Sequence, residues 1–112
     1  LFATPTGSTA YSLSAGGPIL APKMECILMT PVCPHSLFSR SVLFSGESEL
    51  SVHVKIPEEC CCVLTIDGEK NVPVLATDRV VIRKSDLKLK LALLHNRNFY
   101  KLLNEKLKER DF

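Results

Sequence analysis

The sequence predicts a mainly β fold with one short helix near the start and one amphipathic helix at the end. Proline, glycine, aspartate or serine interrupts the chain roughly every ten residues, and most segments between these interruptions are apolar and β-prone. Only the last segment has apolar residues at helical spacing. Short strands spaced in this way are typical of a sandwich or a curled sheet.

The composition of the 112 residues is that of an ordinary globular protein, with 46% hydrophobic and 23% charged residues. A chain of this size can bury about two thirds of its unfolded surface, so we expect one domain with a hydrophobic core. No apolar run approaches the ~18 residues of a membrane span, and the first residues do not resemble a secretory signal. We therefore expect a cytoplasmic protein without a membrane partner. The first residue is not Met, which suggests a fragment of a longer protein.

The formal net charge of +2 is too small to indicate a nucleic acid partner. Residues 84–112 alone hold eight basic and four acidic side chains. A solvated, lysine-rich helix explains this bias more simply than an anionic binding surface, although both interpretations remain open.

Five cysteines are present, at positions 26, 33, 60, 61 and 62. An odd number with three in a row favours neither a disulfide scaffold nor a zinc site. We expect reduced thiols that pack as small apolar residues.

The first predicted element is a short helix over residues 9–15, with a serine or threonine cap before it and a glycine stop at Gly16 and Gly17. Alternating apolar residues then predict strands, and Asp67-Gly68 predicts a tight turn between two of them. The expected strands are residues 26–32, 41–45, 49–55, 60–66, 72–75, 79–83 and 87–93.

The last two segments differ in period. In residues 87–93 leucine alternates with lysine or alanine, which predicts a strand with one apolar face. In residues 98–109 the apolar side chains recur at helical spacing, so we expect an amphipathic helix whose stripe is a packing surface; these are Phe99, Leu102, Leu103 and Leu107.

Residues 4–18, TPTGSTAYSLSAGGP, are the most informative about function. Six of the first eleven carry aliphatic hydroxyls, and Ser8 and Thr9 stand where a helix begins. Free N–H groups at that point, together with the hydroxyls, suit a polar or anionic ligand. A capped helix with no ligand is the alternative. The segment is neither a P-loop nor a G-x-G-x-x-G motif.

This block closely resembles the signature of the C-terminal domain of bacterial NAD kinases. The resemblance continues at Thr30-Pro31, Pro34-His35-Ser36-Leu37, Ser39-Arg40 and Ile66-Asp67-Gly68, and near the end at Phe99-Tyr100, Leu103 and Lys106-Leu107. One departure is visible, because family members often have Arg-Pro where this chain has Arg40-Ser41.

The resemblance implies a β-sandwich-like C-terminal domain that spans residues 1–112 as a single unit. In the family, a preceding α/β domain carries a GGDGT loop with the catalytic Asp, followed by an Asn-Glu pair. The GGDGT loop is absent from these residues, and no Asn-Glu pair stands at the start of the chain, so we expect no catalytic residue in this chain. The implied activity is transfer of a phosphoryl group from ATP, or another donor, to the 2′-hydroxyl of the adenosine ribose of NAD.

The resemblance also implies which residues bind NAD. Thr9, Ala10, Tyr11 and Ser14 match family positions that contact the dinucleotide. Cys33, His35 and Gly68 match positions that line the same cleft. Mg²⁺ or another divalent metal would accompany ATP, mainly on the preceding domain, and the family forms homodimers or homotetramers. The alternative from another class is a non-catalytic nucleotide-binding or oligomerisation module related to the second domain of lipid kinases.

Overall fold

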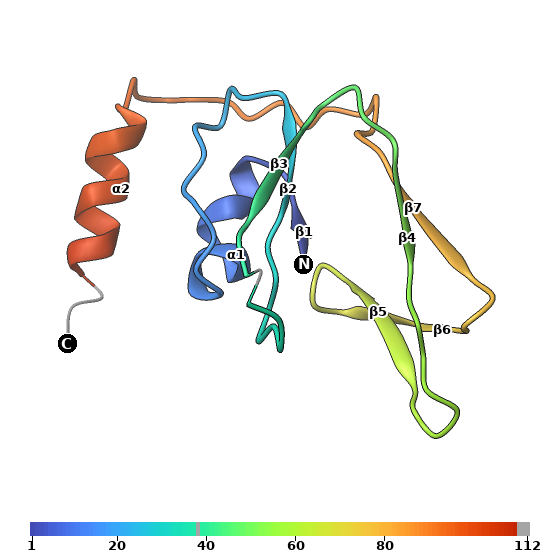
Figure 1. Ribbon diagram of the computed structural model, residues 1–112. Helices are drawn as coiled ribbons and strands as arrows, with labels where there is room; N and C mark the ends of the chain where they lie inside the picture. The colour runs from blue at the N-terminus through green and yellow to red at the C-terminus, as the bar shows by residue number, and fades with distance from the viewer. Residues whose placement is uncertain (38, 110–112) are drawn as a thin grey trace.

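The computed structural model describes residues 1–37 and 39–109. Within them the chain is mainly β, with helices near both ends, as predicted (Figure 1). The strands are β1 (Phe2–Ala3), β2 (Cys26–Met29), β3 (Val42–Ser45), β4 (Leu50–His53), β5 (Cys62–Ile66), β6 (Lys70–Val74) and β7 (Arg79–Ile82). The helices are the 3₁₀-helix η1 (Thr6–Thr9), α1 (Tyr11–Ser14) and α2 (Phe99–Lys108).

The strands form three small antiparallel sheets, ordered β1–β2–β3, β4–β7 and β5–β6. The first sheet lies beside η1 and α1, and the two-stranded sheets lie on the other side of the molecule (Figure 1). In β4 the expected alternation is present, since Leu50 and Val52 are half-buried while Ser51 and His53 are exposed. The strand β1 was not predicted, because two residues are too few to show a period.

The predicted N-terminal helix is present but is broken at Ala10, whose backbone (φ −99°, ψ −124°) separates η1 from α1. The predicted serine or threonine cap is wrong, because neither helix has a side-chain cap hydrogen bond. The predicted glycine stop is confirmed. Gly16 has a φ of +87°, the left-handed conformation that ends helices, and its N–H donates to the Leu13 carbonyl.

The predicted turn at Asp67-Gly68 is confirmed and joins β5 to β6. Both residues have positive φ, +52° and +75°, and the Glu69 N–H donates to the Ile66 carbonyl at 3.1 Å. Positive φ at two successive central residues is the backbone of a type I′ turn, which matches the twist of the flanking strands.

The predicted strand at residues 87–93 is wrong. The segment pairs with no strand of the described chain, and Leu87, Leu89, Leu91 and Leu93 are 75–89% exposed. A two-residue period makes one face apolar, but a strand also needs a neighbour for its backbone N–H and C=O groups.

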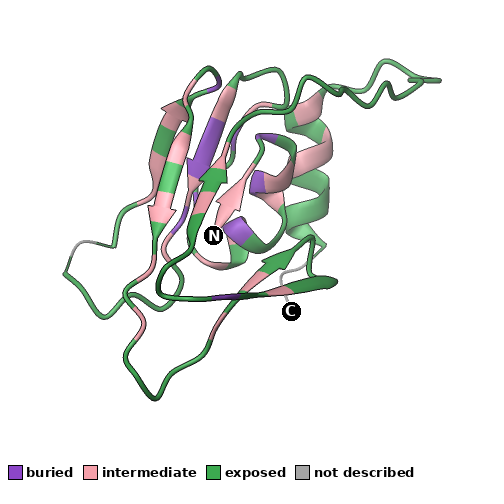
Figure 2. Cartoon of the chain, turned by 90° about the vertical axis from the view of Figure 1, so that its right-hand side faces the viewer, coloured by how far each residue is buried: buried purple, intermediate pink, exposed green. Residues whose placement is uncertain are grey.

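The hydrophobic core is smaller than expected. Its buried apolar residues lie mainly on β2 and near α1, and they are Leu20, Ile27, Leu28 and Val74 (Figure 2). The radius of gyration is 16.3 Å, whereas a compact domain of this length has about 13 Å. The cysteines are all free thiols. The prediction that they pack as apolar residues is wrong for Cys33, Cys60 and Cys61, which are exposed, whereas Cys26 and Cys62 are half-buried. In the part of the chain described here, the helices are all too short to cross a membrane.

The C-terminal helix is confirmed within one residue of each predicted end. Asn98 caps it, because its Oδ1 accepts hydrogen bonds from the backbone N–H groups of Tyr100 (2.9 Å) and Lys101 (3.3 Å). The lysines at its end, Lys106 and Lys108, lie where the helix dipole is negative.

Candidate functional site

The hydroxyl-rich segment divides into a buried face and an exposed face. Ser8 and Ser12 are 0% and 1% exposed, and they point into the domain. The Ser8 hydroxyl donates to the Pro5 carbonyl at 2.6 Å and accepts from the Leu20 N–H at 3.0 Å. These two serines therefore hold the segment in place and are not available to a ligand.

The exposed face carries three of the residues that the resemblance assigned to NAD. Tyr11 is 62% exposed, and Ala10 and Ser14 are exposed as well. Tyr11 and Ser14 are three residues apart on α1, which places them on one side of a helix. The phenol ring, a hydroxyl and the backbone at Ala10 thus form one small surface open to solvent.

The expectation of a free N–H group at Ser8, near the start of the helix, is wrong. The Ser8 N–H donates to the Pro5 carbonyl, the Ala10 N–H to the Gly7 carbonyl, and the Gly7 N–H to Thr4 Oγ1. These donors are already used inside the turn. The backbone N–H groups of Gly7, Ser8 and Ala10 are therefore not free to bind an anion.

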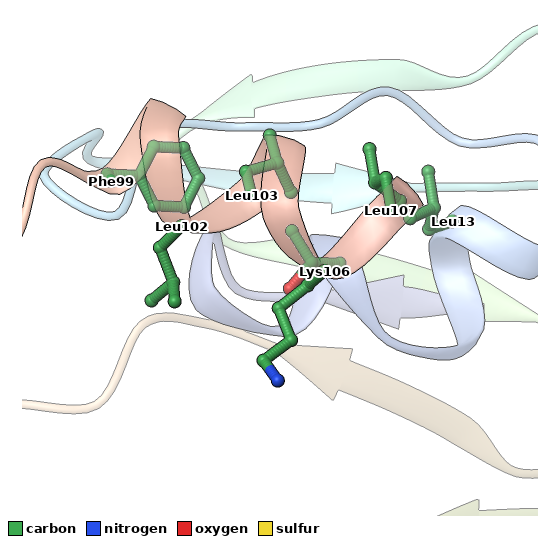
Figure 3. A pocket seen from close by; sticks show the side chains of 7 residues that line it. Leu13, Phe99, Leu102, Leu103, Lys106 and Leu107 are labelled. Carbon is green, nitrogen blue, oxygen red and sulfur yellow. The ribbon is translucent and has the colours of Figure 1, made fainter. Parts of the chain in front are cut away.

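Thr9 is half-buried and is the last residue of η1. Its Oγ1 donates to the Thr6 carbonyl at 3.3 Å, a long hydrogen bond that leaves the oxygen able to accept another. Thr9 also lines a cavity of about 260 Å³ between α1 and α2 (Figure 3). The other lining residues are Leu13, Phe99, Leu102, Leu103, Lys106 and Leu107.

This cavity explains the apolar stripe of α2. The stripe faces Leu13 of α1 (Figure 3), but no residue of α2 is buried, so the predicted packing surface is left partly open. No sequence pattern indicated that Leu13 would line this cavity, because one apolar residue in a four-residue helix shows no period.

Cys33 and His35 lie together on the loop between β2 and β3, and both are exposed. Cys33 has a φ of +47°, which is uncommon for a residue with a Cβ. Such strained positions concentrate at functional sites, and the structure gives Cys33 no packing role that would explain the strain.

Gly68 lies at the tip of the β5–β6 hairpin. This hairpin is a separate sheet from β1–β2–β3, the sheet that lies beside α1. A Cβ at Gly68 would meet no atom within 4 Å, so the requirement for glycine comes from its positive φ alone. Among the described residues, no hydrogen bond joins Gly68, the Cys33–His35 loop and the exposed face of α1.

The ion pairs among the described residues lie outside the surface formed by Ala10, Tyr11 and Ser14. Glu25 accepts a hydrogen bond from Lys84 Nζ and has Lys88 Nζ 4.0 Å away. The hydrogen bond and charge of Lys84 lower the pKa of Glu25, and the hydrogen bond to Glu25 raises the pKa of Lys84. Within residues 1–37 and 39–109, no three His, Cys, Asp or Glu side chains gather as a metal site would require.

Comparison with known proteins accounts for this arrangement. Residues 1–94 match the ATP-NAD kinase C-terminal domain. The NAD kinase of Carboxydothermus hydrogenoformans is 44% identical over 109 residues, which are 97% of this chain and 39% of the relative. The NAD kinase of Magnetococcus marinus is 45% identical over 107 residues, 96% of this chain and 35% of the relative.

A solved structure is similar as well. The yeast NADH kinase complexed with NADH superposes with a TM-score of 0.72 at 29% sequence identity, covering 99% of this chain and 35% of that one. The chain thus spans little more than a third of the length of the proteins it matches.

The match over residues 1–94 and the structural similarity to a NADH kinase define the class of the chain as a kinase C-terminal domain. The chain belongs to the NAD kinase family, and it corresponds to the C-terminal domain of that family.

Proposed function

We propose that this chain is the NAD-binding portion of an NAD kinase, an enzyme that transfers the γ-phosphoryl group of ATP to the 2′-hydroxyl of the adenosine ribose of NAD. One observation carries the proposal. In a segment whose Ser8 and Ser12 hydroxyls are buried and bonded within the fold, Ala10, Tyr11 and Ser14 remain exposed on one face. These are three of the positions that the family uses to contact NAD.

Each residue has a distinct role in this proposal. The Tyr11 ring supplies a flat surface beside a base, Ser14 and Thr9 supply hydroxyls, and Ala10 supplies its backbone. Cys33, His35 and Gly68 border the same cleft in the assembled enzyme. Phosphoryl transfer depends mainly on positioning and on neutralising charge, so a chain that only holds the acceptor is a sensible part of such an enzyme.

In this proposal the phosphate donor is bound by a different domain of the enzyme. The described residues contain no cluster that fits a divalent metal, so no metal ligand is assigned to this chain. ATP, its divalent metal and the catalytic Asp are assigned to a GGDGT-bearing domain. A cytoplasmic homodimer or homotetramer completes the proposal, and five free thiols are consistent with a reducing compartment.

The test compares this chain with the full open reading frame that contains it. Both are purified and incubated with NAD, ATP and Mg²⁺, and NADP is measured with an NADP-specific dehydrogenase. We expect NADP from the full protein and none from residues 1–112 alone. NADP formation by the 112 residues at the rate of the full protein would show that the catalytic group lies within them. No NADP from a folded full protein would overturn the proposed activity.

A further inference from the structure

A buried hydroxyl cluster ties α1 to the first sheet. Ser12 Oγ on α1 lies 2.8 Å from Thr30 Oγ1, which directly follows β2, and the Ser41 hydroxyl donates to the same Thr30 oxygen at 3.3 Å. Ser12 and Thr30 are each 1% exposed. Buried hydroxyl pairs without water contact are costly to separate, because each oxygen would lose its only partners.

Thr30 is itself held firmly by the sheet. Its N–H donates to the Leu1 carbonyl at 2.8 Å, and its carbonyl accepts from the Leu1 nitrogen at 2.9 Å. Both backbone groups and the side chain of Thr30 are therefore fixed. Because α1 has only four residues, its own hydrogen bonds cannot determine its orientation, and tertiary contacts must do so.

Gly17 closes this arrangement from the other side. A Cβ at Gly17 would lie 2.4 Å from Ser12 Oγ and 2.7 Å from Thr30 Oγ1. Its N–H donates to the Ser12 carbonyl at 2.8 Å. Gly17 thus packs directly against the hydroxyl pair and leaves no room for a side chain there. This close packing helps to hold α1 in one position.

We propose that Thr30 is a positioning residue for dinucleotide binding. Through Ser12 it fixes α1, and so it sets where Tyr11 and Ser14 stand, although it is too deeply buried to touch a ligand. The inference rests on the proposed function, because it concerns the surface that is proposed to bind NAD. It adds a residue, Thr30, whose contribution is geometric and acts on α1 through its hydroxyl contact with Ser12.

The experiment uses the full-length enzyme and four variants: Thr30→Val, Thr30→Ser, Ser12→Ala and the Ser12→Ala/Thr30→Val double variant. Thr30→Val and Ser12→Ala should each raise KM for NAD about tenfold, with kcat and KM for ATP unchanged. Thr30→Ser keeps the hydroxyl and should stay within about twofold of wild type. The double variant should be no worse than Thr30→Val alone, because Thr30→Val already removes the contact with Ser12.

A stability control separates positioning from general loosening. Val74→Ala removes buried apolar volume from β6, away from α1, and should lower the melting temperature without raising KM for NAD. If Thr30→Val does not fold, Ser12→Ala and Thr30→Ser carry the comparison.

The outcomes distinguish this inference from the proposed function. If Tyr11→Ala raises KM for NAD while Thr30→Val and Ser12→Ala leave it unchanged, the positioning role is overturned and the NAD site stands. A Thr30→Ser variant as impaired as Thr30→Val would also overturn it, because the hydroxyl would not be responsible. If Tyr11→Ala leaves KM unchanged as well, the NAD site on α1 is itself wrong, and the inference falls with it.

Discussion

Ser12 and Thr30 are eighteen residues apart in sequence, and their hydroxyl oxygens lie 2.8 Å apart in the interior. This contact explains why the signature segment can be rich in hydroxyls without exposing most of them. The hydroxyl side chains of this segment serve two purposes. The buried ones hold the fold together, and only the solvent-facing ones can contact a ligand. The predictions below test the two groups separately.

The two adjacent glycines should differ sharply in their tolerance of substitution. Gly17→Ala would place a Cβ 2.8 Å from the Ser12 carbonyl oxygen and even nearer to two hydroxyls, so we expect a loss of about 3 kcal/mol in the free energy of unfolding. Gly16→Ala meets open space and carries only the strain of positive φ, about 1–2 kcal/mol. Urea unfolding of both variants measures this, and equal losses would contradict the close approach at Gly17.

Tyr11→Ala in the full-length enzyme should raise KM for NAD about five- to a hundredfold, because stacking on a base is worth roughly 1–3 kcal/mol. The melting temperature should hardly change, since the ring is 62% exposed. Tyr11→Phe keeps the ring and should retain most of the affinity. Steady-state kinetics with varied NAD decides the matter, and an unchanged KM in Tyr11→Ala would remove Tyr11 from the site.

Thr9→Val tests a hydroxyl with two possible roles. If it meets the dinucleotide, KM for NAD should rise about two- to tenfold, corresponding to 0.5–1.5 kcal/mol for one hydrogen bond. Its hydrogen bond to the Thr6 carbonyl is long, at 3.3 Å, so we expect little change in the melting temperature. A lowered melting temperature with unchanged KM would assign Thr9 to the fold alone.

The Glu25–Lys84 pair should give a small pH-dependent contribution to stability. The lowered pKa of Glu25 stabilises the fold above the carboxyl's ordinary value of 4.5, and this contribution disappears as the pH falls through the lowered value. The raised pKa of Lys84 stabilises the fold below its ordinary value of 10.5, and this part disappears as the pH rises through the raised value. The pair therefore acts throughout the neutral range.

Glu25→Gln should slightly lower the melting temperature at pH 7 and make no difference at low pH. Both side chains are largely exposed, so 1 M NaCl should suppress the effect through screening. Glu109→Gln is the matched control. It removes the exposed Lys106–Glu109 pair of α2, whose residues are three positions apart and therefore join no distant segments of the chain. A difference at pH 7 that survives high salt would show that the pair is not acting through exposed charge.

The exposed leucines of residues 87–93 should make the 112-residue chain associate with itself. Replacing Leu89 and Leu91 by Gln should reduce association, because those side chains are 85% and 75% exposed. Replacing Lys88 and Lys90 by Gln changes the same number of neighbouring residues and should not reduce it. Light scattering in reducing buffer over a range of concentrations checks this, and a strict monomer at high concentration would contradict it.

Apart from the two-residue β1, the sequence predicted each strand that has a pairing partner among the described residues. Residues 49–55 alternate in polarity and form β4 against β7, and Asp67-Gly68 forms the predicted turn. Residues 87–93 alternate equally well and form no strand, because a local period carries no information about which neighbour is available.

The candidate site could be located from the sequence but not interpreted in detail. Hydroxyl composition indicated residues 4–18, yet it could not separate the buried Ser8 and Ser12 from the exposed Ser14. That separation depends on the break at Ala10 and on the contact with Thr30, which lies in a different element. Tertiary contacts of this kind override local preference and leave no local signal.

The nesting of the strands has a consequence for the order in which the chain folds. Ile66 pairs with Lys70, four positions on, whereas Leu50 pairs with Ile82, thirty-two positions on. Hairpins with short connections close within about 1–10 μs, while distant pairings wait for an entropically costly loop to close. Because the β5–β6 hairpin lies entirely inside the β4–β7 connection, its early formation shortens the free loop that the outer pair must close. The β5–β6 hairpin should therefore speed the pairing of β4 with β7, although it forms no sheet with either strand.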